Sequence, residues 1–269
     1  MTVICIETST SVCSAAICKD GQPLKQCICL EGSNHARLLP LYIEELLQFA
    51  KQQHLSIDAV ALSEGPGSYT GLRIGTSTAK GLCYGLNVPL IPVPTLQVLS
   101  SAAKASITND QSPITNHQSP ITNCIFLPLL DARRMEVYTA LYDTDLHPLS
   151  EVQAVVVENE ESFSEAVFQC QRSFSVNGLS AERYYREVVY FGDGAAKCAA
   201  VFTKPNWHYL PDIVPEAQYL GRLITNLQSP ETKLIAPLWQ RITNRQLAYY
   251  EPFYLKEFIA AQSHVKGLK

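Results

Sequence analysis

The order of apolar segments in the first part of this chain is the feature that most constrains its fold. Three runs rich in β-branched residues and cysteine come first, at 3–6, 12–18 and 24–30, and Asp20-Gly21 forms a turn signal between the last two. Apolar residues at helical spacing follow over 36–52. Strand and helix signals then alternate, which gives the order βββαβαβα and predicts an antiparallel meander continued by parallel strands.

A looser form of the same order returns in the second part of the chain. Its strand signals lie at 124–130, 136–142, 152–157 and 187–191, and a helical pattern lies at 162–170. Two related α/β halves are the plan of the duplicated ribonuclease-H-like fold found in actin, Hsp70 chaperones and sugar kinases (the ASKHA fold). We therefore predict this fold, by analogy at the level of architecture.

A polar repeat interrupts this plan. The heptapeptide Ile107-Thr-Asn-Asp-Gln-Ser-Pro113 is followed at once by a near copy at 114–120, and related strings recur at 224–230 and 242–246. The copies lack an apolar face, so we interpret them as inserted surface loops; a functional tail or a solenoid is the other interpretation. The predicted parts of the chain are an N-terminal actin-like domain (1–103), an inserted surface segment (104–123), a second actin-like domain (124–214), and a C-terminal helix and tail with further insertions that packs back on the first domain (215–269).

Composition excludes several classes of function. A net charge of -4 leaves no basic excess to hold nucleic acid without help. The nine cysteines are scattered without a CxxC pair, which predicts reduced core residues and a cytoplasmic location. The first residues lack the basic and apolar regions of a secretion signal. Prolines interrupt the apolar run at 85–96, so we expect no membrane span.

The glycine loop, defined here as residues 65–70, joins a predicted strand to a predicted helix. Its glycines permit positive φ, and either Ser68 or Thr70 can cap the helix that follows. A tight strand-to-helix turn and an anion-binding loop both explain the pattern, because N–H groups at a helix N-terminus attract phosphate. The loop residues are Gly65, Pro66, Gly67, Ser68, Tyr69 and Thr70.

The string GPGSYTGLRIG at 65–75 closely resembles the TsaB family, also called YeaZ, the bacterial partners of TsaD. The resemblance covers most of the chain outside the repeats. Its further landmarks are Ile6-Glu-Thr-Ser9, His35 through Pro40, Ala79-Lys-Gly81, Asn87 through Pro92, Asp131-Ala-Arg133, Val137-Tyr138 and Pro252-Phe-Tyr-Leu-Lys256.

This resemblance implies a non-catalytic partner subunit that acts with TsaD and TsaE, and in functional linkage with TsaC. Together these proteins form N6-threonylcarbamoyladenosine at position 37 of ANN-decoding tRNAs, and TsaD performs the transfer. The resemblance also implies tRNA contact only through the complex, no membrane partner, no cofactor of the chain's own, and bound ATP or ADP near the TsaD interface. A homodimer is expected when TsaD is missing.

The resemblance also indicates that this chain is not an enzyme on its own. TsaD carries metal-binding histidines where Thr95 and Leu99 stand here, and neither residue replaces imidazole as a ligand, so no metal site is expected. The phosphate-binding glycines of ATP-using relatives are missing after Glu7 and at 131–134. An ATP-dependent kinase and a glycoprotease-type metallopeptidase remain as alternatives. The residues expected nearest to a nucleotide are Glu7, Thr8, Ser9, Asp131 and Arg133.

Two arginines follow Asp131 in the predicted turn. Arg133 and Arg134 can grip an anion, or they can form an ion-pair network with Asp131 and Glu136, and we favour the network. Gly192-Asp-Gly194 likewise fits either a nucleotide-base border or a plain turn, and we favour the turn.

The helix at 71–86 carries glycines that need a reason, because each interior glycine costs about 1 kcal/mol relative to alanine. One line holds Gly71, Gly75 and Ala79, and a neighbouring line holds Gly81 and Gly85. Close approach to the chain's own sheet and close approach to a partner helix both remain open. We predict that helices 36–52 and 71–86 form a four-helix contact with TsaD or a second copy. The predicted interface residues are Leu38, Leu41, Tyr42, Gly71, Leu72, Gly75, Ala79 and Leu82.

Overall fold

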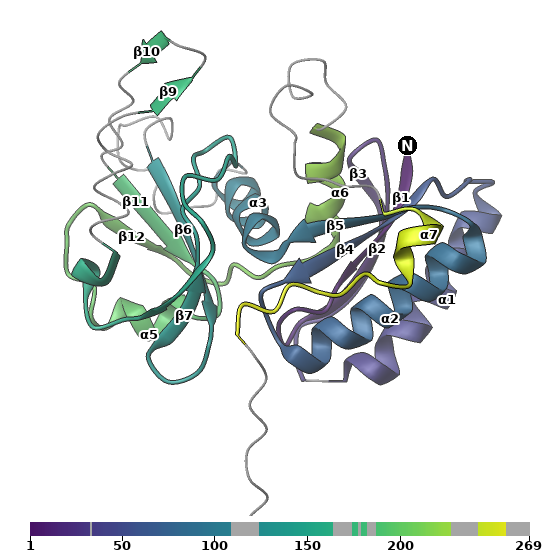
Figure 1. Ribbon diagram of the computed structural model, residues 1–269, viewed down its shortest axis with the longest axis horizontal. Coiled ribbons are helices and arrows are strands. Elements are labelled where there is room, and N and C mark those ends of the chain that lie inside the picture. Colours follow the sequence, from purple (N-terminus) through teal and green to yellow (C-terminus); the bar gives the residue numbers. More distant parts are fainter. Residues whose placement is uncertain are drawn as a thin grey trace, which may run out of the picture.

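The computed structural model describes residues 1–32, 34–108, 124–163, 174–176, 179–181, 187–226 and 242–256. Its first half is a five-stranded sheet in the order β3-β2-β1-β4-β5 (Figure 1). The β1-β2 and β2-β3 pairs are antiparallel, whereas β4 pairs in parallel with both β1 and β5. The strands are β1 (Thr2–Glu7), β2 (Cys13–Lys19), β3 (Gln22–Cys29), β4 (Ala59–Gly65) and β5 (Leu90–Pro94).

Helices cover both faces of this sheet because its central strands are apolar on both sides. Alternate residues of β1 divide between two cores: Ile4 and Ile6 pack with α1 (His35–Gln52) and α2 (Tyr69–Leu86), while Val3 and Cys5 pack with α3 (Thr95–Thr108) and α6 (Ala217–Asn226). The two 18-residue helices α1 and α2 therefore share one outer face of the molecule.

The second half repeats the same topology. Its sheet order is β12-β11-β6-β7-β8, in which an antiparallel meander of β6, β7 and β8 is extended by parallel β11 and β12. The predicted duplicated fold is confirmed. These strands are β6 (Cys124–Asp131), β7 (Glu136–Thr139), β8 (Gln153–Val156), β11 (Glu187–Phe191) and β12 (Trp207–Leu210).

The remaining elements of the described part are short. They are η3 (Glu160–Phe163), β9 (Phe174–Val176), β10 (Leu179–Ala181), α5 (Ala195–Ala199) and α7 (Asn244–Leu247). The strand predicted at 136–142 ends earlier, at Thr139, although Tyr142 still bridges to Phe126. Most of the helix predicted at 162–170 lies outside the described residues.

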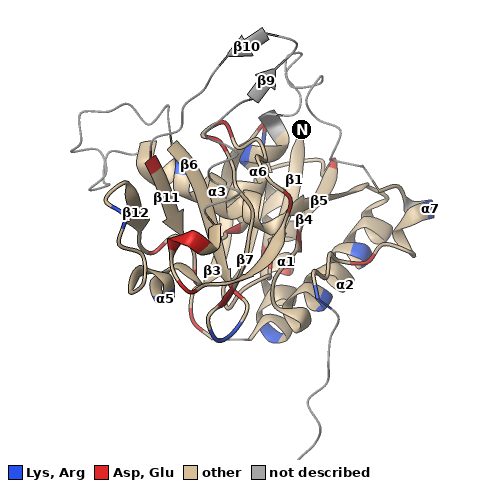
Figure 2. Cartoon of the chain, turned by 60° about the vertical axis from the view of Figure 1, so that its left-hand side comes forward, with Lys and Arg blue, Asp and Glu red and all other residues tan. Residues whose placement is uncertain are grey.

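Figure 2 shows Lys and Arg interspersed with Asp and Glu over the described residues. The net charge of -4 leaves no overall excess of positive charge. Within the described residues, no helix is both long enough and apolar enough to cross a membrane.

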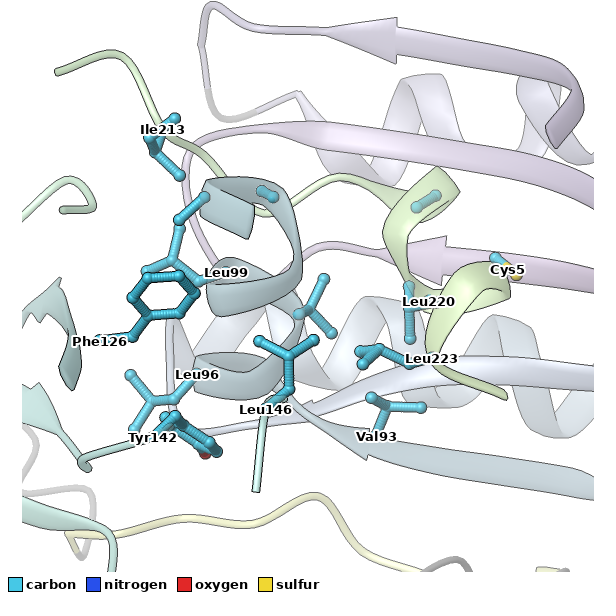
Figure 3. Packing of buried hydrophobic residues seen from close by; sticks show 14 of the residues in the cluster. Cys5, Val93, Leu96, Leu99, Phe126, Tyr142, Leu146, Ile213, Leu220 and Leu223 are labelled. Carbon is cyan, nitrogen blue, oxygen red and sulfur yellow. The ribbon is translucent and has the colours of Figure 1, made fainter. Parts of the chain in front are cut away.

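A shared core holds the two halves together. Leu96 and Leu99 of α3 meet Phe126 of β6 and Tyr142, and the same cluster extends to α6 (Figure 3). Phe126 also packs edge-to-face on Phe191, with ring centroids 5.7 Å apart. Burying each such side chain contributes about 1.5–3 kcal/mol, so this cluster stabilises the contact between the two halves.

The C-terminal strap, defined as residues 242–256, runs back along the first half. Leu90 and Ile242 exchange both backbone hydrogen bonds, at 3.1 and 2.9 Å. Lys80 of α2 donates to the carbonyl oxygens of Ala248 and Tyr250 at 3.0 and 2.9 Å. The repeat fragment 242–246 is therefore joined to the sheet and starts α7, whereas the repeat positions at 109–123 and 227–230 lie outside the described residues.

Candidate functional site

The glycine loop packs against the chain's own backbone. Gly65 has a φ of +121°, and a Cβ atom added there would lie 2.3 Å from the carbonyl oxygen of Phe253 in the strap. A Cβ on Gly67 would lie equally close to the carbonyl oxygen of Ser9. The N–H of Ser68 donates to that oxygen at 2.6 Å. Only glycine fits at these two positions, because other backbone already occupies the space.

Ser68 begins α2, as one of the two predicted caps. Its Oγ accepts a hydrogen bond from the N–H of Gly71 at 3.3 Å. Two N–H donors of the loop region, those of Ser68 and Gly71, are thus used within the chain. A phosphate cradle needs such donors free and aimed at the ligand, so the geometry favours the strand-to-helix turn over the anion-binding loop.

The inward line of α2, defined as Gly71 and Gly75, faces the end of β1. A Cβ on Gly71 would lie 2.0 Å from the carbonyl oxygen of Thr8, and the Thr8 hydroxyl donates to the carbonyl of Gly71 at 2.8 Å. A Cβ on Gly75 would lie 2.3 Å from that same hydroxyl oxygen and 3.1 Å from Leu62. The close approach that these glycines permit is therefore to the chain's own sheet.

This packing corrects half of the predicted interface. Gly71 and Gly75 are buried between α2 and β1, and Leu72 and Ala79 are 1% and 0% exposed. A partner helix cannot reach these four residues while the domain is folded. Their four-residue spacing does indicate close packing, as the sequence suggested. The neighbour that packs closely, however, is β1 of the same chain.

The outward line of α2, defined as Gly81 and Gly85, is open. A Cβ added to either glycine meets nothing within 4 Å. Beside Gly81 an apolar groove of about 640 Å³ lies between α1 and α2. The residues lining this helix groove are Pro40, Ile43, Glu44, Leu47, Gln48 and Lys51 from α1 and Thr78, Gly81 and Leu82 from α2.

Of the other four predicted interface residues, only Leu82 is among the residues that line the helix groove. Leu41 is 55% exposed on α1. Leu38 and Tyr42 are half-buried against the core beneath the two helices. The sequence prediction missed Ile43, Leu47 and Thr78 as lining residues. The paired glycines at 81 and 85 were the available signal for this face.

A second hollow, the interdomain cleft, has a volume of about 490 Å³. The glycine loop and Ser9 form one wall, residues 130–133 with Asp193 form the other, and the strap contributes residues 253–256. Of the residues predicted near a nucleotide, Ser9, Asp131 and Arg133 do line this cleft. Glu7 and Thr8 do not, because both are fully buried behind the wall.

Two residues that line the cleft, Asp131 and Lys256, form ion pairs. Asp131 pairs with Lys197, whose Nζ also donates to the carbonyl of Glu136 at 2.6 Å. Lys256 of the strap pairs with the Glu136 carboxylate and so links the strap to the second half. The N–H of Asp131 donates to Asp193 Oδ1 at 2.9 Å. Burial, and then the charge of Asp131, raises the pKa of Asp193, against opposing hydrogen bonds from the backbone.

The predicted arginine network is not what the structure contains. Arg133 and Arg134 are exposed and have left-handed φ values of 74° and 51°. Among the described residues neither forms an ion pair with Asp131 or Glu136, because Lys197 and Lys256 take those carboxylates. The long side chains of these lysines approach from α5 and from the strap, which only the tertiary fold brings near.

The glycine loop does not provide a phosphate cradle in the first wall of the cleft. In the first wall, the space beside Gly65 and Gly67 that a phosphate group would need is filled by the backbone of Phe253 and Ser9. The opposite wall presents Asp131 and Asp193 beside Arg133, and Lys256 of the strap also lines the cleft, so the cleft carries charges of both signs. Gly192 and Gly194 pack on the carbonyl oxygen of Leu129, so this segment is the plain turn favoured above.

Thr95 and Leu99 are both committed to the fold. The Thr95 hydroxyl oxygen lies 2.8 Å from the Ser63 hydroxyl and accepts from the N–H of Gly65 at 3.1 Å. Leu99 is fully buried in the shared core. Neither side chain is free to coordinate a metal or to act on a substrate.

Glu7 is the most unusual carboxyl group of the described part. Its Oε1 accepts hydrogen bonds from the N–H and the hydroxyl of Ser9, at 2.6 and 2.5 Å, while its Oε2 has no partner. Burial raises the pKa of Glu7, and the hydrogen bonds from Ser9 oppose the shift. The group supports the end of β1 on which α2 rests.

Within the described residues, one group of side chains has metal-like spacing: Asp143, Asp145 and His147. The carboxylate of Asp143 accepts from the N–H groups of Asp145 and His147 at 2.9 and 2.8 Å. These hydrogen bonds organise a turn, and they give the acidic group a structural role.

Comparisons with known proteins agree with this architecture. A family model described as "TsaD: tRNA N6-adenosine threonylcarbamoyltransferase" matches residues 30–257. The chain is 34% identical over 103 residues to the tRNA threonylcarbamoyladenosine biosynthesis protein TsaB of Haemophilus influenzae, covering 38% of this chain and 43% of that protein. It is 32% identical over 147 residues to the Escherichia coli protein of the same name, covering 54% and 56%.

The matched segments thus span about half the length of these curated relatives. Among solved structures, YeaZ from Pseudomonas aeruginosa superposes with a TM-score of 0.64 at 20% identity, covering 94% of this chain and 99% of that one. That likeness shows the fold. The resemblance to TsaB noted from the sequence is confirmed.

Proposed function

The chain belongs to the TsaD family, described as tRNA N6-adenosine threonylcarbamoyltransferase, and we propose that it acts in threonylcarbamoyladenosine synthesis as a partner subunit rather than as the transferase. In this proposal it binds TsaD and supports the transfer to position 37 of ANN-decoding tRNAs. TsaE joins the complex, TsaC acts separately in a functional link, and tRNA is held by the complex.

The helix groove is the observation that carries this proposal. The two long helices α1 and α2 lie on one outer face, and the groove between them is apolar. Gly81 lines this groove, and a Cβ atom added to it would meet nothing within 4 Å. An apolar groove of this kind accepts the ridge of another helix, because a small residue lets two helix backbones approach closely. A pair of helices from TsaD placed here would complete a four-helix contact, and a second copy of this chain would take the same place when TsaD is missing.

The way Thr95, Leu99 and the glycine loop are packed supports a partner role rather than a catalytic one. Thr95 and Leu99 are used in packing, and the glycine loop is filled by the chain's own backbone. No feature of the described residues favours the kinase or the metallopeptidase alternative. ATP or ADP bound to the complex would therefore have to rely on TsaD for its phosphate contacts.

Substitution of Gly81 tests the docking surface directly. Gly81→Arg places a long cation in the helix groove without disturbing the fold, since the space is open and arginine favours a helix more than glycine does. We expect the variant to lose co-elution with TsaD on size exclusion while its circular dichroism spectrum stays unchanged. Val156→Arg, which adds the same charge at an exposed apolar site on β8, is the matched control and should co-elute.

Reconstitution tests the functional role. TsaC, TsaD and TsaE are incubated with tRNA, threonine, bicarbonate and ATP, with or without this chain, and modified adenosine is measured by mass spectrometry. We expect product to depend on this chain and to be lost with Gly81→Arg. Equal product in the presence and absence of the chain would refute the partner role.

A further inference from the structure

Two cysteines stand directly opposite each other across β2 and β3. The antiparallel register pairs Cys13, the first residue of β2, with Cys29, the last residue of β3. Directly opposed residues in an antiparallel pair have Cα atoms about 4.5 or 5.5 Å apart and side chains on the same face. Both spacings fall in the range of about 4.4–6.8 Å that a disulfide requires.

The two thiols differ in their access to solvent. Among the described cysteines, Cys29 is the one that is not buried, whereas Cys13 is fully buried. The Sγ of Cys29 donates to the carbonyl oxygen of Glu31 at 3.0 Å, so the thiol lies at the protein surface beside the turn that leads to α1. A small oxidant can therefore reach Cys29 but not Cys13.

Burial also lowers the reactivity of the Cys13 thiol. Burial, followed by the charges of Cys29 and Glu7, raises the pKa of Cys13 to about 11. Cys13 thus stays a protonated thiol at neutral pH, and the first reaction with an oxidant falls to Cys29.

Cys5 and Cys18 provide an internal contrast. They also interact, and they lie on β1 and β2 on the opposite face of the same sheet, but both are buried under α6 at Gly221. The register places Cys5 opposite Ala16 and Cys18 opposite Val3, so this pair is diagonal rather than directly opposed. We therefore do not expect Cys5 and Cys18 to form a disulfide, because an oxidant cannot reach them and they are not directly opposed.

We propose that Cys13 and Cys29 form a peroxide-reactive dithiol site that closes to a reversible cross-strand disulfide. Hydrogen peroxide oxidises the Cys29 thiol to a sulfenic acid and releases one water. The Cys13 sulfur then attacks the Cys29 sulfur, the S–O bond breaks, and the departing hydroxide takes the Cys13 proton to leave as a second water. A thiol reductant such as glutathione reverses the reaction. The site does not rest on the proposed function.

The test uses the full chain, reduced and then treated with a small excess of hydrogen peroxide. Free thiols are alkylated, and non-reducing digestion with mass spectrometry locates the crosslink. We expect a loss of two alkylatable thiols, a Cys13–Cys29 crosslinked peptide in monomeric protein, and full recovery with glutathione. In Cys13→Ala the bond cannot close, and we expect dimedone to label Cys29.

Cys27→Ser is the matched control, because Cys27 lies on the same face of β3 but opposite Ala15. This variant should still form the Cys13–Cys29 bond. A crosslink to any other cysteine, loss of the bond in Cys27→Ser, or over-oxidation of Cys29 without a crosslink would each overturn the proposal.

Discussion

The inward and outward glycine lines of α2 differ in what lies beside them. Gly71 and Gly75 on the inward line meet Thr8 at 2.0 and 2.3 Å from the position of an added Cβ, while Gly81 and Gly85 on the outward line meet nothing within 4 Å. The two lines share one helix and the same four-residue spacing. Their roles are opposite, because one line closes the chain's own fold and the other leaves a surface open.

The difference shows how far a glycine pattern can be interpreted. Glycine in a helix costs stability, so a regular line of glycines indicates that something approaches closely. The pattern does not say whether that neighbour belongs to the same chain. Here the neighbour of the inward line is β1, and the outward line is the one available to a partner helix.

The largest expected effect comes from filling the inward line. Gly71→Ala adds one methyl group 2.0 Å from the carbonyl oxygen of Thr8, which is backbone and cannot turn aside. We expect a loss of about 3 kcal/mol in the free energy of unfolding, since the overlap outweighs the better helix propensity of alanine. Urea denaturation followed by circular dichroism measures this free energy. An unchanged midpoint would show that the backbone at Thr8 can move to make room for the methyl group.

The next largest effect concerns Glu7. Its carboxylate accepts hydrogen bonds from Ser9, which follows the Thr8 that Gly71 and Gly75 approach. Its pKa is raised from an ordinary value near 4.5, so in the window above 4.5 the folded state holds a proton that the unfolded state has lost. Stability therefore falls as pH rises through that window and is level above the folded pKa. Glu7→Gln removes this fall, and we expect the variant to gain stability relative to the parent between acid and neutral pH.

Urea denaturation of both proteins at a series of pH values measures this difference. A gap that stays constant with pH would mean that Glu7 does not titrate differently in the folded chain. Ser9→Ala is a useful companion, because it removes a hydroxyl that donates to Glu7 while the backbone donor stays.

The smallest effect comes from filling the outward line with the same methyl group. Gly81→Ala meets no neighbour and replaces a poor helix former by the best one. We expect a gain of about 1 kcal/mol in the free energy of unfolding. Gly81→Ala is the matched counterpart of Gly71→Ala. If the two glycine lines differ as described, the first raises and the second lowers the free energy of unfolding, and two changes of the same sign would contradict the comparison.

Much of the fold could be predicted from the sequence, because periodicity reports burial directly. The helices at 35–52 and 69–86 lie within two residues of the predicted 36–52 and 71–86. Three strand runs before the first helix also indicated the meander. The strand predicted at 136–142 was too long, since apolar residues after Thr139 are buried in the shared core without continuing the ladder.

The candidate sites could be predicted only in part. Ser9, Asp131 and Arg133 were expected together, and all three line the cleft. The partners of Asp131 and Glu136 were not foreseen, because Lys197 and Lys256 are far from them in sequence. Ile43 and Leu47 line the helix groove but were not among the predicted interface residues.

The sequence by itself determined the duplicated architecture and the resemblance to TsaB, since these depend on residue order and local conformation. The tertiary structure alone decided which glycines face inward, which cations pair with the cleft carboxylates, and that Cys13 lies opposite Cys29. Each of these depends on the register of strands and the rotation of helices, which bring together residues that local preferences do not connect.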